Sequence, residues 1–519
     1  MKVALLLGIA TLSLGAASPA PRKVDLLIRG GTIYTGTAEP FVGDVAIRGD
    51  RIVSVSRHAD VTATRVIDAK GMIVAPGFID PHTHVGDDLT SDDAAKRLVP
   101  AFLMQGVTTA FIGNDGGGSP DVAKVLGSAA AKPVGINYAA YVGFGAVREK
   151  VVGEADRVPT DAELGRMKAL VGQAMCEGAL GLSTGLFYAP QSFARTDEVV
   201  ALAREAGRRG GVYDSHIRDE SSYTVGLAAA IDEAIAIGRE GGLPAHISHI
   251  KALGVDVQGQ APAIIAKVEA ARRAGQRVTA DQYPWSASGT SLVASLMPLW
   301  AQDGGRPALL KRFDDPALAD KLRAGTTENL RKRGGADKLL IVEGKYANRT
   351  LADVAKELGQ DPVAAAITVI RIADPGVVSF NQSEADIAKF MQQPWVMTSS
   401  DASGGHPRVY GSFARKYDKY VKADHVITLR QFIERSSALT ADTFGLAGRG
   451  HLRAGAFADV VVFDPKTYAA RATYEAPTLL AQGVRSVVVN GVVALDKGAL
   501  TGKAAGRALA HRPTTGMCR

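Results

Sequence analysis

The segment GFIDPHTHVG contains two histidines, His82 and His84, separated by a single residue. They are the first residues along the chain whose type and spacing could do chemistry. Side chains two residues apart in a strand point to the same side, so both imidazoles would project together. Imidazoles held in this way can bind one divalent ion such as zinc. The pair alone is also compatible with two polar residues in a loop, so the choice depends on other ligand-type residues.

The middle of the chain alternates short apolar, β-rich runs with Ala-, Glu- and Arg-rich stretches of helical period. Eight runs separated by helices predict an α/β fold, a (β/α)8 TIM barrel. The runs cover residues 77–85, 106–115, 135–145, 178–188, 210–220, 243–251, 276–285 and 394–402. In most of them the polar residues come last. Because the active site of such a barrel lies at the C-terminal strand ends, these polar residues are the candidates for function.

Four further ligand-type residues stand at these strand ends. They are Asp115 in the second run, His216 in the fifth, His249 in the sixth and Asp401 in the eighth. A barrel would bring them to His82 and His84 at its mouth, which predicts a metal centre. Asp115 has a second interpretation, as a turn residue before three consecutive glycines.

The remaining histidines fit a metal site less well. His246 lies on the same predicted strand as His249 but with opposite parity, so it is expected to be packed or to support a ligand. His406, in the segment HPR, is a weaker candidate. The others lie outside the strand ends and are expected to be surface or structural residues: His58, His425, His451 and His511.

Both ends of the chain have the pattern of short strands and turns, in residues 24–75 and again in 458–465 and 484–498. We therefore expect a small β-sandwich domain built from both chain ends. The predicted organisation is a composite β-domain (21–75 and 450–500), a barrel (76–449) with a helical insertion at about 288–393, and a C-terminal tail (501–519).

The first residues resemble a cleavable export signal, with Lys2, an apolar stretch from Val3 to Leu14 and small residues ending in AASPA. We expect residues 1–20 to be removed and the protein to be periplasmic or secreted. The apolar stretch is shorter than the roughly 20 residues of a spanning helix, and no Cys follows it, so no membrane anchor is expected.

The formal net charge of +7 comes from basic residues interspersed among acidic ones. Nucleic-acid binding would need a basic stripe or an aromatic platform, and neither is present in the sequence. The expected partner is a small molecule, and the sequence does not indicate an oligomeric state. Cys176 and Cys518 lie far apart and are expected to be two independent thiols, although a disulfide is possible in an oxidising compartment.

The segment APGFIDPHTH resembles the entry to the amidohydrolase superfamily. Further motifs narrow the resemblance to the N-acyl-D-amino-acid deacylase (D-aminoacylase) family, in order and at similar spacing over about 24–498. They are GVTTAFIGNDG, GALGLSTGLFYAP, HIRDE, SHIKALG, QYPWSASGTSL and SSDASGGHPRVYGSFAR.

The resemblance implies one or two zinc or other divalent ions. It assigns His82, His84 and Asp401 to one metal position, and His216 and His249 to the other with a ligand from the second strand. The family has Cys there, in Gly-Asn-Cys-Gly, whereas this chain has Asp115. A carboxylate can bind or bridge divalent ions but is a harder ligand than a thiolate. No Lys ends the third or fourth run, where some amidohydrolases have a carbamylated bridging lysine.

By the same resemblance, Asp401 is the catalytic residue that takes a proton from water and delivers it to the leaving amine. A purely structural ligand role is the alternative. Lys251, Tyr188 and Arg408 would clamp the substrate α-carboxylate, and Tyr283 is a further pocket or oxyanion candidate. Lys251 and Arg408 could instead be surface charges, and Tyr188 a rim aromatic.

The function that follows is metal-dependent hydrolysis of N-acyl-D-amino acids, and the preference for D over L substrates comes only from the resemblance. One alternative is an exported dipeptidase or amidase acting on D-residue-containing peptides. A second is a non-catalytic metal or ligand-binding barrel, which would be expected to lack some ligands or the proton-transfer carboxylate; all are present.

Overall fold

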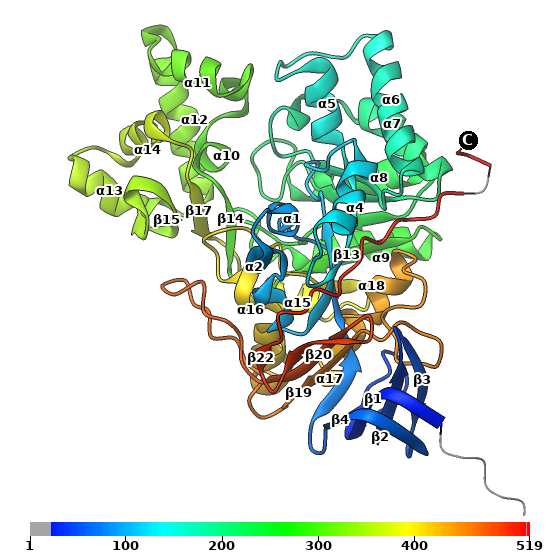
Figure 1. Cartoon of the computed structure of the whole chain (residues 1–519). Coiled ribbons are helices and arrows are strands. Elements are labelled where there is room, and N and C mark those ends of the chain that lie inside the picture. Colours follow the sequence, from blue (N-terminus) through cyan, green and yellow to red (C-terminus); the bar gives the residue numbers. More distant parts are fainter. Residues whose placement is uncertain (1–21, 515, 519) are drawn as a thin grey trace, which may run out of the picture.

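The computed structural model describes residues 22–514 and 516–518, so the predicted export signal lies outside the described residues. Each of the eight predicted runs contains a strand, which confirms the barrel (Figure 1). The strands are β6 (Phe78–Asp80), β7 (Val107–Ile112), β8 (Asn137–Ala140), β10 (Gly181–Gly185), β11 (Val212–His216), β12 (Ala245–Ile247), β13 (Val278–Gln282) and β18 (Val396–Thr398).

The strands pair in parallel as two arcs, β6-β7-β8 and β9-β10-β11-β12-β13-β18, where β9 (Val142–Gly143) directly follows β8. One seam is joined where Leu180 N donates to Ala140 O at 2.8 Å. The other seam joins the first strand to the eighth, just beyond their ends. There Asp401 N donates to His82 O at 2.9 Å, and His84 N donates to Ala402 O at 3.0 Å.

Helices connect the strands and cover the barrel. In α7, for example, the buried residues Val199, Leu202, Ala203 and Ala206 form one apolar stripe, because residues three or four positions apart lie on the same face of a helix. This stripe packs against the barrel. The helices are α1 (Gly86–Thr90), α2 (Ala94–Arg97), α3 (Pro100–Leu103), α4 (Val122–Ala131), α5 (Phe144–Val152), α6 (Asp161–Cys176), η1 (Gln191–Phe193), α7 (Thr196–Arg208), α8 (Leu227–Gly241), α9 (Ala261–Arg273), α15 (Glu384–Met391), α16 (Arg408–Arg415), the π-helix η6 (Lys416–Ala423), α17 (Leu429–Arg435) and α18 (Ala438–Thr443).

The two chain ends share one nine-stranded sheet, in which β19 pairs antiparallel with β5. Its order is β22-β21-β20-β19-β5-β1-β2-β3, with β4 beside β1. The pairing makes one connected sheet, and its division into the two packed layers of a sandwich stays a prediction. The strands are β1 (Arg22–Ile33), β2 (Phe41–Arg48), β3 (Arg51–Ser56), β4 (Val61–Asp68), β5 (Ile73–Pro76), β19 (Val460–Phe463), β20 (Val484–Val489), β21 (Val492–Asp496) and β22 (Ala499–Leu500).

The insertion between β13 and β18 stands to one side of the barrel (Figure 1). Besides the expected helices it contains a four-stranded antiparallel sheet, order β14-β17-β15-β16, and it has its own buried apolar cluster. Its elements are β14 (Ala287–Ser291), α10 (Leu292–Leu296), η2 (Leu299–Gln302), α11 (Gly305–Phe313), η3 (Pro316–Leu318), α12 (Ala319–Lys332), η4 (Ala336–Lys338), β15 (Leu339–Ile341), η5 (Gly344–Tyr346), β16 (Arg349–Thr350), α13 (Leu351–Leu358), α14 (Pro362–Ile372) and β17 (Gly376–Phe380).

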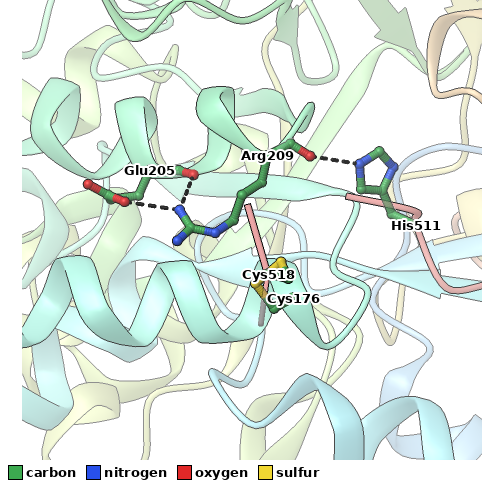
Figure 2. The surroundings of a disulfide bond; sticks show 5 residues. All are labelled: Cys176, Glu205, Arg209, His511 and Cys518. Atoms are coloured by element: carbon green, nitrogen blue, oxygen red, sulfur yellow. Dashed lines mark hydrogen bonds and ion pairs between the residues drawn. A yellow bond between two sulfur atoms is a disulfide. The ribbon is translucent and has the colours of Figure 1, made fainter. Parts of the chain in front are cut away.

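The C-terminal tail runs across the helical side of the barrel (Figure 1). Leu509 N donates to Tyr138 O at 2.7 Å, and Thr514 N donates to Arg209 O at 3.1 Å. The expectation of two independent thiols is wrong, because Cys176 at the end of α6 forms a disulfide with Cys518 (Figure 2). A separation of 342 residues hides this pairing from the sequence, since only the fold brings the tail to α6.

We expect the Cys176→Ser/Cys518→Ser double variant to fold but to lose about 2–4 kcal/mol of unfolding free energy, because the unfolded chain is no longer cross-linked. Chemical denaturation under non-reducing conditions measures this difference. Adding a reductant should destabilise the natural chain and leave the double variant unchanged. Equal stability of the two proteins would contradict the prediction.

Candidate metal centre

The first group of ligand-type side chains forms at the seam between the first and eighth strands. The backbone hydrogen bonds of this seam hold His82, His84 and Asp401 together. Asp401 Oδ1 lies 3.2 Å from His84 Nε2 and 3.6 Å from His82 Nε2. Asp115, from the second strand, completes this group.

The second group consists of His216 and His249, again with Asp115. Asp115 Oδ2 lies 3.8 Å from His216 Nδ1, and Asp115 Oδ1 lies 3.7 Å from His249 Nε2. The same two oxygens face the first group, at 3.5 Å from His84 Nε2 and 3.3 Å from His82 Nε2. The Asp115 carboxylate therefore lies between two sets of imidazoles, where it could bridge two ions.

The backbone explains how Asp115 reaches this position. Its φ of 55° is in the left-handed region, within a turn after β7. Gln191 Nε2 donates to Asp115 O at 2.9 Å. Gly185 lets the turn come close, because a Cβ there would lie 2.5 Å from that same carbonyl oxygen. Asp115 is thus a turn residue in its backbone and a ligand-type residue in its side chain, and the two interpretations are compatible.

The chemistry of these groups fits a divalent metal ion. Both ring nitrogens of His82 and of His216, and Oδ1 of Asp115, are buried without a hydrogen-bond partner among the described residues. Buried polar atoms without partners are costly, and a metal ion would satisfy them. Four imidazoles and two carboxylates make a nitrogen and oxygen ligand set of the kind that zinc accepts.

The charges at the centre reinforce one another. Burial acts to lower the pKa of His84, but hydrogen bonds to Asp115 and Asp401 outweigh it and raise the pKa to about 9. Burial acts to raise the pKa of Asp115, yet the neighbouring imidazoles hold this pKa well below its usual range. Burial acts to raise the pKa of Asp401 as well, but the charge of Arg408 and the neighbouring imidazoles together outweigh it and lower this pKa. Both carboxylates are therefore ionised and able to bind a cation.

Two carboxylates absent from the sequence-based site lie beside the histidines, on the side that faces away from Asp115. Glu220 Oε1 lies 3.1 Å from His249 Nδ1, and its Oε2 lies 3.8 Å from His216 Nε2. Asp281 Oδ1 accepts from His249 N at 3.0 Å, and Oδ2 lies 3.8 Å from His82 Nδ1. Such partners orient metal-binding histidines. Asp281 could have been found by its place at the end of the seventh run, and Glu220 by its place four residues after His216.

The sixth strand is shorter than the sequence predicts, so the expected alternation of His246 and His249 along it is wrong. β12 ends at Ile247, and His249 has a left-handed φ of 34°, so strand alternation does not apply to His249. His246 is buried and hydrogen-bonded to Asp281 at 2.9 Å and Thr279 at 2.8 Å, away from the two ligand groups. His406 Nε2 is 3.1 Å from Ala287 O, which leaves it on the cavity wall.

A cavity of about 420 Å³ opens over the two groups, between the barrel mouth and the insertion. The four predicted substrate-binding residues all line it: Lys251, Tyr188, Arg408 and Tyr283. Arg408 Nη1 lies 2.6 Å from Asp401 Oδ2, and Tyr283 OH accepts from Gln382 Nε2 at 2.9 Å. Thr290 Oγ1 donates to Tyr188 OH at 3.4 Å. Lys251 is paired with Glu220 and lies 2.7 Å from His249 Nδ1.

Comparison with known proteins places this site in a family. The model of the amidohydrolase family (Amidohydro_3) matches residues 65–495. The chain is similar to D-aminoacylase of Alcaligenes xylosoxydans xylosoxydans, at 34% identity over 94% of this chain and 98% of that protein. It is also 34% identical to N-acyl-D-glutamate deacylase from the same organism, over 90% of this chain and 93% of that protein.

Among solved structures, the chain is similar to N-acyl-D-glutamate deacylase from Bordetella bronchiseptica, complexed with zinc and a phosphonate inhibitor that mimics the tetrahedral intermediate. The two chains are 32% identical with a TM-score of 0.81, and the match covers 94% of this chain and 100% of that one. This chain therefore belongs to the amidohydrolase family, in its N-acyl-D-amino-acid deacylase (D-aminoacylase) branch.

Proposed function

We propose that this protein is a metal-dependent hydrolase that cleaves the amide bond of N-acyl-D-amino acids, releasing a carboxylic acid and a D-amino acid. The observation that carries the proposal is the convergence of the two imidazole pairs on the Asp115 carboxylate at the floor of the cavity. The relatives support the substrate class, because D-aminoacylase and N-acyl-D-glutamate deacylase match nearly the whole chain.

Zinc is the ion we propose, supported by the ligand set and by the zinc in the related deacylase structure. His82, His84 and Asp401 would hold one ion, His216 and His249 another, and Asp115 would contact both positions. A zinc ion bound here would polarise the scissile carbonyl and lower the pKa of a water molecule to about 7.

Asp401 is the residue we propose for proton transfer. It is held ionised by Arg408, at 2.6 Å, and its other oxygen faces the imidazoles of the first group. An ionised carboxylate at the centre can accept a proton from the attacking water and return it to the leaving amine. Its left-handed φ of 49° and its backbone hydrogen bond to His82 O fix the carboxylate in place.

The substrate α-carboxylate would bind beside this base. The Arg408 guanidinium contacts both Asp401 and Ser403 Oγ, at 2.7 Å from the latter, and its Nε is buried without a hydrogen-bond partner among the described residues. Tyr283 lies next to it, with its ring centroid 5.1 Å from the guanidinium carbon. A fixed guanidinium with free donors is suited to a carboxylate.

Export is part of the proposal. The leader-like first 20 residues support it, and so does the Cys176–Cys518 disulfide, because disulfides persist in oxidising compartments. No helix in the described part of the chain is long and apolar enough to cross a membrane.

Metal content and substrate range can be measured on the same purified protein. We expect near-stoichiometric zinc in the purified protein, hydrolysis of N-acetyl-D-amino acids but not of their L-enantiomers, and loss of hydrolysis after chelation that zinc restores. Elemental analysis and an amine-release assay measure this. Full turnover by metal-free protein would overturn the metal role. Bound zinc with hydrolysis only of D-residue dipeptides would replace the substrate class by the dipeptidase alternative.

The role of Asp401 as the base can be tested by removing its negative charge. Asp401→Asn should lower kcat by about 10²–10⁴-fold, the usual worth of a general base or acid. Metal content of the variant distinguishes loss of the base from loss of an ion. The control is Asp320→Asn, an exposed aspartate on α12, which should leave kcat unchanged. An Asp401→Asn protein that keeps full hydrolysis would show that another group transfers the proton.

The contribution of Asp115 to metal binding can be tested in the same way. Asp115→Asn should weaken zinc binding by more than about a hundredfold, because even residues that only support metal ligands contribute about 10–100-fold. Competition with a chromophoric chelator measures the affinity. The control is Asp87→Asn, at an exposed aspartate on α1. This variant should bind zinc as tightly as the natural chain does. Unchanged affinity in Asp115→Asn would reduce Asp115 to a turn residue.

A further inference from the structure

Arg333 is a cation of the cavity that the proposed mechanism does not use. It follows the last residue of α12, and its side chain lines the same cavity as Asp115 and Asp401. Arg333 is 2% exposed, and its Nε and Nη1 are buried without a hydrogen-bond partner among the described residues. A guanidinium cannot give up its proton, so two buried guanidinium nitrogens without partners are costly unless an anion reaches them.

The other cations of the cavity already have partners. Lys251 is paired with Glu220, and Arg408 with Asp401. Two more carboxylates line the cavity, but they accept from backbone groups instead: Glu343 from Gly376 N and Asp374 from Val293 N, both at 2.8 Å. In the described part of the chain, no ion pair joins Arg333 to a carboxylate.

The place of Arg333 is fixed by contacts of the residue before it. Lys332 Nζ donates to Ser222 O at 2.7 Å, and Val255 N donates to Lys332 O at 3.2 Å. Gly254 permits this approach, because a Cβ there would lie 2.4 Å from Lys332 O. These contacts dock the end of α12 on the loops that follow β11 and β12. The first of these loops begins directly after His216, and the second contains His249, so Arg333 is held at a fixed position relative to the second ligand group.

An aromatic wall connects Arg333 to that group. The guanidinium carbon lies 5.5 Å from the ring centroid of Tyr223. The Tyr223 ring lies 5.6 Å from that of Phe187, which in turn lies 5.8 Å from the His216 imidazole. Tyr223 and Phe187 also line the cavity. The methylene groups of a substrate side chain could pack along these rings and place a terminal group at Arg333.

We propose that Arg333 binds a carboxylate at the end of the substrate side chain, so that the preferred substrates are N-acyl-D-amino acids with an acidic side chain. The inference rests on the proposed function and names its substrate class. An arginine fork matches a carboxylate through two parallel hydrogen bonds. Arg408, beside the base, serves the α-carboxylate, and Arg333 serves the second anion at the far end of the aromatic wall.

The test compares N-acetyl-D-glutamate with its neutral isostere N-acetyl-D-glutamine, with N-acetyl-D-aspartate and N-acetyl-D-leucine alongside. We expect kcat/KM to favour an acidic substrate over the neutral ones by at least about a hundredfold, because a site built for a charged group rejects analogues that lack it. Arg333→Met, of similar length but uncharged, should abolish this preference and leave turnover of the leucine substrate within about threefold. Arg333→Lys should keep part of the preference.

Arg331→Met is the matched control. Arg331 lies two residues earlier on the same helix, forms an ion pair with Asp256 at the surface and does not line the cavity. It should keep the natural preference. Zinc content and thermal midpoint establish that each variant is folded. A natural enzyme that prefers neutral substrates, or an Arg333→Met protein that keeps the acidic preference, would overturn the inference and leave the proposed function intact.

If none of the substrates is hydrolysed, a binding measurement still tests the Arg333 subsite independently of the proposed reaction. Calorimetric titration of N-acetyl-D-glutamate into the zinc-loaded natural chain and into Arg333→Met would then decide. Binding that falls at least about tenfold in the variant supports the Arg333 subsite although the reaction is another one. Equal binding to both proteins, or no binding to either, overturns the subsite as well.

Discussion

The metal centre depends on the closure of the barrel between its first and last strands. Two backbone hydrogen bonds join the chain around His82 and Asp401, which are more than 300 residues apart in sequence. Because the bonds come from the ligand residues themselves or their immediate neighbours, the seam that completes the barrel also sets the distance between imidazole and carboxylate. The remaining ligands come from strands whose order around the barrel is then fixed. Closure of the barrel therefore also assembles the metal centre.

Much of this architecture could be predicted from the sequence, because its signal is local. Short apolar runs alternating with helical stretches indicated all eight strands, and His or Asp near the ends of several runs indicated the ligand groups. Features that depend on contacts distant in sequence could not be predicted. The Cys176–Cys518 bond requires the tail to lie on α6, and the insertion sheet pairs strands as far apart as β14 and β17. Arg333 carries no motif, and only the docking of α12 onto the barrel loops brings it into the cavity.

The barrel and the insertion contribute different kinds of residues to the cavity. The barrel contributes the groups that we propose bind metal and transfer protons, and these are positioned by paired strand ends and by the buried carboxylates of Glu220 and Asp281. The insertion contributes Arg333 and a wall of apolar and polar residues, from elements with their own apolar core. Such a division lets the pocket wall vary between relatives while the reacting groups stay in place, as expected for a fold that carries many substrates on one scaffold.

The placement of the two cysteines leaves no free thiol in this chain. Its two cysteines are joined to each other near the tail, and Asp115 stands where the sequence resemblance leads one to expect a cysteine ligand. A thiolate ligand can be converted stepwise to sulfenic and sulfinic acids, whereas a carboxylate has no comparable oxidation chemistry. With the disulfide intact, the chain offers no sulfhydryl to peroxide, alkylating agents or organomercurials. Reagents that inactivate a centre through its cysteine have no target among these ligands.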